Sequence, residues 1–188
     1  MRSMKTRLTT YQDWYSNGLF AVKALFFGQN HHYLDHLDVI FKDPCYSDVK
    51  SYFTEYVLAV SRNRPFHNLM LSTYPCLTCP AYIPLIEMRR SAGPERDKPN
   101  YIPKILFEIT VQYKMKEIRR GWKPPPIIAI FEIRQGHPHL YVGDGTHRYE
   151  ALRRIGYREY YAIICYHPSN ETDLNRHLTS IASRREIR

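Results

Sequence analysis

The hexapeptide at positions 143–148, which reads Gly-Asp-Gly-Thr-His-Arg, has the residue types and spacing of a phosphate-binding turn. Its two glycines, Gly143 and Gly145, let the main chain approach a ligand closely and adopt positive φ angles. A helix is expected to begin at Thr146, and the first amides of a helix have no partner within it, so they attract anions. We therefore predict that the glycines, the Thr146 hydroxyl and these amides bind phosphate.

The charged side chains of the turn suit chemistry on such a phosphate. Arg148 can make a two-pronged contact with phosphate oxygens, and Asp144 can hold a Mg²⁺ ion that bridges them. His147 can act as an acid, a base or a hydrogen-bond donor. Glu150, one helical turn further on, can orient water or hold the ion through solvent. The alternative is a plain strand-to-helix turn, in which Asp144 caps the helix and Arg148 is a surface charge; the set as a whole favours the functional interpretation.

The elements that must position this turn alternate between strands and helices, which predicts an α+β fold with a small mixed sheet packed by helices. A strand pattern precedes the turn, and a helix pattern that ends at Gly156 follows it. The helix expected over 103–120 should bury Ile105, Leu106, Ile109 and Tyr113. The expected strands are 81–88, 127–133, 139–142 and 160–166, and the expected helices are 103–120, 146–155 and 172–187.

Residues 1–80 have a different pattern, which predicts a helical N-terminal extension packed on a core domain at 81–188. A helix is expected over Thr10 to Phe27, and Asp43-Pro44 is a helix start signal. Four prolines predict loop or irregular structure from Arg62 to Pro84. The helix after Asp43-Pro44 should dock on the core through an apolar stripe formed by Val49, Tyr52, Phe53, Tyr56, Val57 and Val60.

The composition indicates a polyanion-binding protein. The 27 Lys and Arg residues outnumber the 18 Asp and Glu residues, which gives a net charge of +9. Such a field attracts DNA, RNA or nucleotides, although a basic surface can also serve solubility alone. Apolar runs fall short of the roughly 20 residues of a membrane helix, so we expect a cytoplasmic protein that reaches the inner membrane's cytoplasmic face only through partners.

Two further groups have the spacing of metal ligands. Cys76 and Cys79 resemble half of a zinc site, but no second pair supplies the other ligands, so a plain loop is favoured. His32 and His36 are one helical turn apart and also lack fixed companions.

The segment 142–152, with its continuation from Ile155-Gly156-Tyr157 to Ile164, resembles the DGxHRxxA core of ParB-like and sulfiredoxin-like domains. The resemblance covers about half the chain, and it implies a ParB/sulfiredoxin-like fold. It also implies that positions 143 and 145–148 hold the phosphates of ATP or another nucleotide, and that Asp144 handles Mg²⁺. Where members often place a charged residue facing the nucleotide, this chain has Glu87, expected as a base or metal partner, followed by Arg89 and Arg90, expected to bind phosphate.

Members of this superfamily include CTP-binding partition proteins, sulfiredoxins, amino-acid kinases, DNA nucleases and plasmid fertility-inhibition proteins. The resemblance therefore implies a nucleotide-hydrolysing and DNA-cleaving protein, with DNA and type IV secretion components as partners, that blocks export of T-DNA or conjugative DNA. A small-molecule kinase and a non-catalytic DNA- or nucleotide-binding inhibitor module remain alternatives. Sulfiredoxins have a catalytic cysteine where this chain has Thr146, so sulfinic-acid reduction is not expected.

Overall fold

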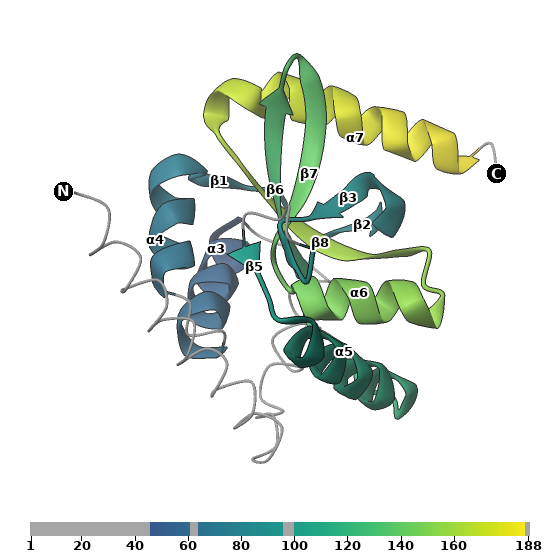
Figure 1. Ribbon diagram of the computed structural model, residues 1–188. Helices are drawn as coiled ribbons and strands as arrows, with labels where there is room; N and C mark the ends of the chain where they lie inside the picture. The colour runs from purple at the N-terminus through teal and green to yellow at the C-terminus, as the bar shows by residue number, and fades with distance from the viewer. Residues whose placement is uncertain (1–45, 61–63, 96–99, 187–188) are drawn as a thin grey trace.

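The computed structural model describes residues 46–60, 64–95 and 100–186, and its centre is a six-stranded mixed sheet (Figure 1). The strands run in the order β1-β8-β6-β7-β3, and β2 also pairs with β8. The β6–β8 and β7–β3 pairs are parallel and the other pairs antiparallel, which agrees with the predicted α+β class. The strands of this sheet are β1 (Cys76–Leu77), β2 (Ala81–Pro84), β3 (Met88–Arg90), β6 (Ile127–Arg134), β7 (His137–Asp144) and β8 (Glu159–Tyr166), and β4 (Ala92–Gly93) pairs separately with β5 (Asn100–Tyr101).

Helices cover both faces of the sheet (Figure 1). One face packs against the first helical elements of the described chain, and the other face packs against the later ones. None of the helices described is long and apolar enough to cross a membrane. The first group is α3 (Tyr46–Glu55), the π-helix η1 (Tyr56–Val60) and α4 (Arg64–Thr73), and the later elements are the short helix η2 (Leu85–Glu87), α5 (Lys104–Arg119), α6 (Thr146–Ile155), the short helix η3 (Pro168–Asn170) and α7 (Glu171–Glu186).

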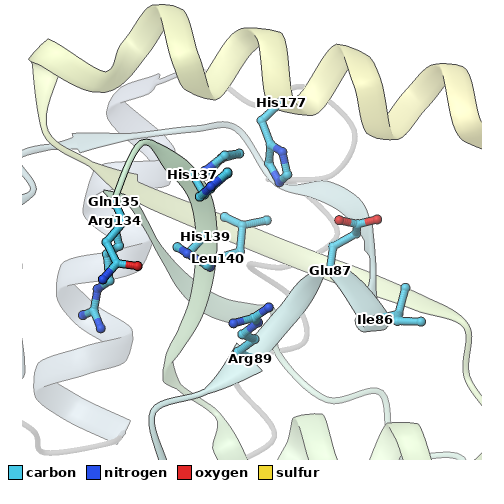
Figure 2. Close-up of a pocket in the computed structure, with 10 residues that line it drawn as sticks. Ile86, Glu87, Arg89, Arg134, Gln135, His137, His139, Leu140 and His177 are labelled. Atoms are coloured by element: carbon cyan, nitrogen blue, oxygen red, sulfur yellow. The ribbon is translucent and has the colours of Figure 1, made fainter.

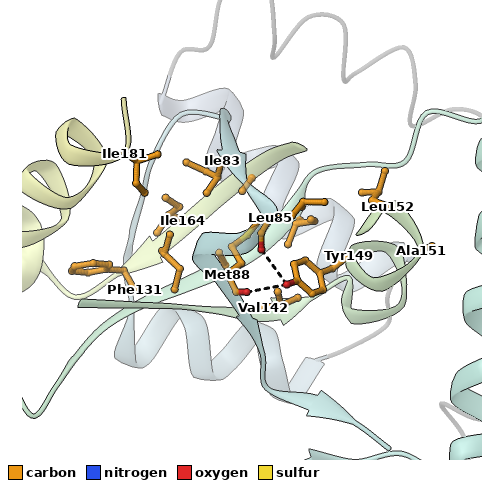
Figure 3. Close-up of a cluster of buried hydrophobic side chains, with 14 of the residues drawn as sticks. Ile83, Leu85, Met88, Phe131, Val142, Tyr149, Ala151, Leu152, Ile164 and Ile181 are labelled. Carbon is orange, nitrogen blue, oxygen red and sulfur yellow. Dashed lines mark hydrogen bonds between the residues drawn. The ribbon is translucent and has the colours of Figure 1, made fainter. Parts of the chain in front are cut away.

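The central strand β6 separates two apolar cores by its alternation. Ile127, Ala129 and Phe131 belong to the core shared with α5, α6 and α7, whereas Ile128 belongs to the core shared with α3, η1 and α4. Figure 3 shows Phe131 in the first of these cores. Successive residues of a strand point to opposite faces, so a strand buried on both sides reads as a continuous apolar run. In the larger core the Tyr149 hydroxyl donates to the main-chain oxygens of Leu85 (3.0 Å) and Met88 (2.9 Å), which fastens α6 to the chain between β2 and β3.

Five residues of the predicted N-terminal stripe pack on the sheet, and the side chain of the sixth, Val60, lies outside the described residues; one expected loop is a helix. Val49, Tyr52, Phe53, Tyr56 and Val57 are buried against the sheet. The segment expected to be irregular contains α4, because its first proline occupies the second helical position. Proline is tolerated in the first turn of a helix, where its missing amide has no helical partner to lose.

Helix α5 forms where expected but buries a different face. Ile105, Leu106 and Ile109 are largely exposed, and the buried side chains are Phe107, Val111, Met115 and Ile118. The predicted face was therefore wrong. Both stripes have helical spacing, and contact with α6 and the sheet, which local periodicity does not report, selects the one that contains Phe107.

Several predictions fall outside the described residues. These are the helix over Thr10 to Phe27, the start signal Asp43-Pro44, and the pair His32 and His36. The boundary near residue 80 stays a prediction, although β1 joins the sheet from the N-terminal side of it.

Candidate functional site

The hexapeptide 143–148 forms the expected strand-to-helix turn. Strand β7 ends at Asp144, Gly145 adopts φ +91° and ψ 20°, and the first helical bond of α6 runs from the Tyr149 amide to the Gly145 oxygen. The N-cap residue is Gly145, which supplies no side-chain cap, and Thr146, only 8 % exposed, follows it as the first helical residue. The turn therefore presents the uncapped amides that the sequence predicts.

The two glycines of the turn are needed for different reasons. A Cβ atom on Gly145 would lie 2.6 Å from Arg148 Nη2, and the positive φ angle disfavours other residues as well. A Cβ atom on Gly143 would lie 2.9 Å from the ring of Phe66 in α4. The first glycine thus admits a helix from the N-terminal part of the chain, and the second admits the arginine of the turn itself.

Arg148 is 9 % exposed and its guanidinium group is held within the protein. Its Nη2 atom donates to Asp144 Oδ2 (3.1 Å) and to the main-chain oxygen of Pro126 (3.3 Å), and its Nη1 atom donates to the Tyr56 hydroxyl. That hydroxyl in turn donates to Asp144 Oδ2 (3.0 Å). Tyr56, from the π-helix η1, therefore joins the two charged side chains of the turn from a position about 90 residues earlier in the chain.

Charge is retained in this triad despite its burial. Burial alone lowers the pKa of Arg148, but Tyr56 and Asp144 raise it above its ordinary value. Burial raises the pKa of the Tyr56 phenol well above its ordinary value, although Arg148 opposes this. Asp144 and Arg148 thus form a buried ion pair bridged by a neutral hydroxyl. Removing one member of such a pair is costly, because the other is left buried without a partner.

His147 of the turn and Lys114 of helix α5 lie where these two elements meet. The His147 ring is 5.0 Å from the Phe107 ring, and burial, then Lys114, lowers the pKa of His147 to about 4, so the imidazole is neutral at pH 7. Burial, then the charge of Arg148, lowers the pKa of Lys114 to about 8. Its Nζ atom lies 4.6 Å from the centre of the Trp122 ring, and it forms no ion pair with any described carboxylate.

Lys114 is the site residue that the sequence interpretation missed. It follows Phe107 by seven positions and Val111 by three, so it lies on the edge of the buried stripe of α5. A lysine at the edge of an apolar helical stripe is the signal that could have found it, because its charged group must find either a partner or a water-filled opening.

Glu150 points to a separate network rather than to the turn. Only 2 % exposed, it accepts hydrogen bonds from Arg153 (3.1 Å) and Arg154 (2.8 Å) and lies 3.6 Å from Arg90 Nε. Burial raises the pKa of Glu150, but the arginine bonds bring it below its ordinary value. Glu150 and Arg90 line a cavity of about 440 Å³ beside α5, which contains none of the residues 143–148.

Glu87 and Arg89 line a second hollow, together with the first residues of strand β7. Glu87 forms an ion pair with Arg184 of α7 (3.1 Å). Because a strand rises about 3.4 Å per residue, the hollow near His139 and the turn at Asp144 are separated by roughly 17 Å. The structure thus brings Asp144, His147 and Arg148 together and distributes Glu87 with Arg89, and Glu150 with Arg90, over two other places.

No group of three or more metal-ligating side chains occurs in the described part of the chain. Cys76 lies in β1, and the exposed Cys79 follows that strand. For Mg²⁺, the single carboxylate at the turn is neutralised by Arg148, so the residues present do not fit a protein-held ion.

Comparison with known proteins leaves the family of this chain open. No family model matches it, and no curated protein matches it. Among solved structures, the chain is similar to sulfiredoxin from Arabidopsis thaliana, with 27% sequence identity over 54% of this chain and 98% of that chain, and a TM-score of 0.35. A TM-score this low carries no conclusion about activity, and the α+β class rests on the strands and helices themselves.

Proposed function

We propose that this protein binds the phosphate groups of a nucleotide at the amino end of α6, where the turn 143–148 meets helix α5. The observation that carries the proposal is Lys114, a partly desolvated ammonium group without a described carboxylate partner. Keeping such a cation charged inside a protein is unfavourable unless an anion joins it. The uncapped amides of α6 lie at the turn beside it and supply donors for phosphate oxygens.

The arrangement favours binding over hydrolysis. Each carboxylate that the sequence offers as a base or metal ligand is already ion-paired: Asp144 with Arg148, Glu150 with three arginines, and Glu87 with Arg184. His147, with a pKa of about 4, is neutral at pH 7 and serves there as a hydrogen-bonding group rather than as a proton donor. This supports the nucleotide-binding alternative over the ATP-hydrolysing and DNA-cleaving one.

The test is titration calorimetry with ATP, CTP and GTP on the full chain. Lys114→Met keeps a long unbranched side chain and removes the charge that lies over the Trp122 ring, and we expect it to weaken nucleotide binding about 10- to 100-fold, as expected for a charge-assisted hydrogen bond. Lys116→Met, on the exposed side of the same helix, is the matched control and should bind like the unsubstituted protein. Binding that is the same in both variants would refute the site.

Two further conditions sharpen this test. Affinity should fall as the pH rises through about 8, because free Lys114 loses its proton there. Binding should persist in EDTA, because Asp144 has no spare charge for Mg²⁺; loss of binding in EDTA would restore the metal-dependent interpretation.

The catalytic alternatives have their own readouts. The unsubstituted protein could release inorganic phosphate from ATP or nick plasmid DNA. If that activity disappears in Lys114→Met, the site catalyses a reaction and does not only bind nucleotide. Transfer of the phosphate to a free amino acid would favour the kinase. The fertility-inhibition role, with type IV secretion components as partners, stays a prediction for a conjugation assay.

A further inference from the structure

A hollow of about 540 Å³ opens at the end of β7 that is remote from the turn (Figure 2). It lies between the β6–β7 hairpin, the chain from η2 into β3, and helix α7, from which His177 reaches toward it. Strand β3 begins opposite Leu140, so the first residues of β7 extend past it and leave this space. The volume is that of a pocket for a nucleotide-sized ligand.

The hollow has an uncompensated positive charge. Glu87 is bound by Arg184, and Arg134 donates to Glu132 (2.7 Å), so these charges are neutralised in pairs. Arg89, exposed on β3, forms no ion pair with a described carboxylate. Its guanidinium group is therefore available to an anion, and its fork of donors matches phosphate oxygens.

Three histidines complete the wall: His137 and His139 from β7, and His177 from α7. Burial, then the charges of Arg89 and Arg134, lowers the pKa of His139. Burial also lowers the pKa of His177, against the pull of Glu87. An anion bound beside these rings would raise the pKa of the histidines, against the effect of the arginines. Its binding would therefore be coupled to proton uptake. The charged and titratable groups around the rings are Glu87 from η2, Arg89 from β3, Glu132 and Arg134 from β6, His137 from β7, and Arg184 from α7.

The aromatic ring of Tyr141, on strand β7, lies beside the hollow. Tyr141 is the register partner of Arg89, the Arg134 guanidinium lies 4.4 Å from the centre of its ring, and the His139 ring lies 5.7 Å from it. Tyrosine, histidine and arginine in contact make a surface on which a nucleobase can stack while its phosphate meets a cation.

We propose that this hollow binds the phosphate group of a nucleotide unit, either free or within a single strand of nucleic acid, and that the binding strengthens as the pH falls. The site is separate from the turn 143–148 and does not depend on the function proposed there. Arg89 contacts the phosphate, and His139 and His177 become protonated when it is bound.

The experiment uses the full chain with Lys114→Met, so that any binding at the turn is weakened and the hollow is measured against a lower background. The probes are fluorescein-labelled dodecathymidylate, followed by anisotropy, and thymidine monophosphate, followed by calorimetry, each at about pH 8 and about pH 5.5. We expect Arg89→Gln to weaken binding at least about tenfold. The matched control, Arg119→Gln on the exposed face of α5, removes the same charge elsewhere and should have a much smaller effect.

Affinity should rise between about pH 8 and about pH 5.5, and the double variant His139→Asn, His177→Asn should lose most of that rise. If Arg89→Gln weakens binding of the oligonucleotide alone, the site is specific for nucleic acid. If it also weakens binding of the mononucleotide, the site accepts nucleotide phosphates in general. Both results support the proposal. Equal effects of Arg89→Gln and Arg119→Gln, an affinity that does not change with pH, or absence of binding by both probes overturns it.

Discussion

Arg148 in α6 and Arg89 in β3, the elements that follow and flank strand β7, have charges that are handled in opposite ways. At the turn, Arg148 is buried and bound by Asp144, Tyr56 and Pro126. On β3, Arg89 is exposed and has no described carboxylate partner. A net charge of +9 therefore does not say which arginines meet a ligand. In the turn the arginine supports the architecture, and the proposed ligands of phosphate there are the amides and Lys114, whereas on β3 the arginine itself is available.

Replacing each of these arginines by methionine should separate the two roles. Arg148→Met leaves Asp144 and the Tyr56 hydroxyl without their partner, and we expect the free energy of unfolding to fall by about 3–5 kcal/mol. Arg89→Met removes only a solvated charge and should change the free energy of unfolding by less than about 0.5 kcal/mol. Urea denaturation of both variants measures the difference, and similar midpoints would mean that the buried triad contributes no more to stability than an exposed arginine does.

The sequence predicts the turn correctly because the turn is local. Glycine spacing, a strand pattern and a helix pattern suffice to place Gly145 before α6. The sequence does not predict the partner of Arg148, because Tyr56 comes from the opposite face of the sheet and is brought near only by tertiary packing.

The contacts of Glu150 were also not predicted from the sequence. Glu150 lies one helical turn from the hexapeptide in sequence, yet it is directed at Arg90 and at its helical neighbours Arg153 and Arg154. Two of these partners lie three and four positions further along the same helix, a spacing that the sequence contains, whereas Arg90 is brought near only by tertiary packing.

Acid should destabilise the turn end more than the hairpin end. Burial, with Lys114 next, depresses the pKa of His147 from 6.5 to about 4, so the unfolded chain takes up a proton more readily than the folded one. The stabilisation is complete above pH 6.5 and is lost as the pH falls through 4, at a cost of up to about 3 kcal/mol. Thermal unfolding from pH 7 to 4 should therefore show a shallower loss of stability in His147→Gln than in His137→Gln, an exposed control at the hairpin. Parallel profiles would contradict the burial of the His147 ring.

The smallest of the three expected losses of stability comes from removing the Tyr56 hydroxyl, which bridges Asp144 and Arg148. Tyr56→Phe keeps the ring, whose centre lies 5.2 Å from the Arg148 Cζ atom, and removes one donor to Asp144 and one acceptor from Arg148. Hydrogen bonds to charged groups each contribute about 1.5–3 kcal/mol, and the direct Asp144–Arg148 pair survives, so we expect a loss of about 2 kcal/mol. Tyr141→Phe, which alters the ring beside the hairpin hollow, should cost less than about 0.5 kcal/mol. If both substitutions have equally small effects on chemical denaturation, the ion pair alone closes the turn, and the π-helix η1 serves only to pack against the sheet.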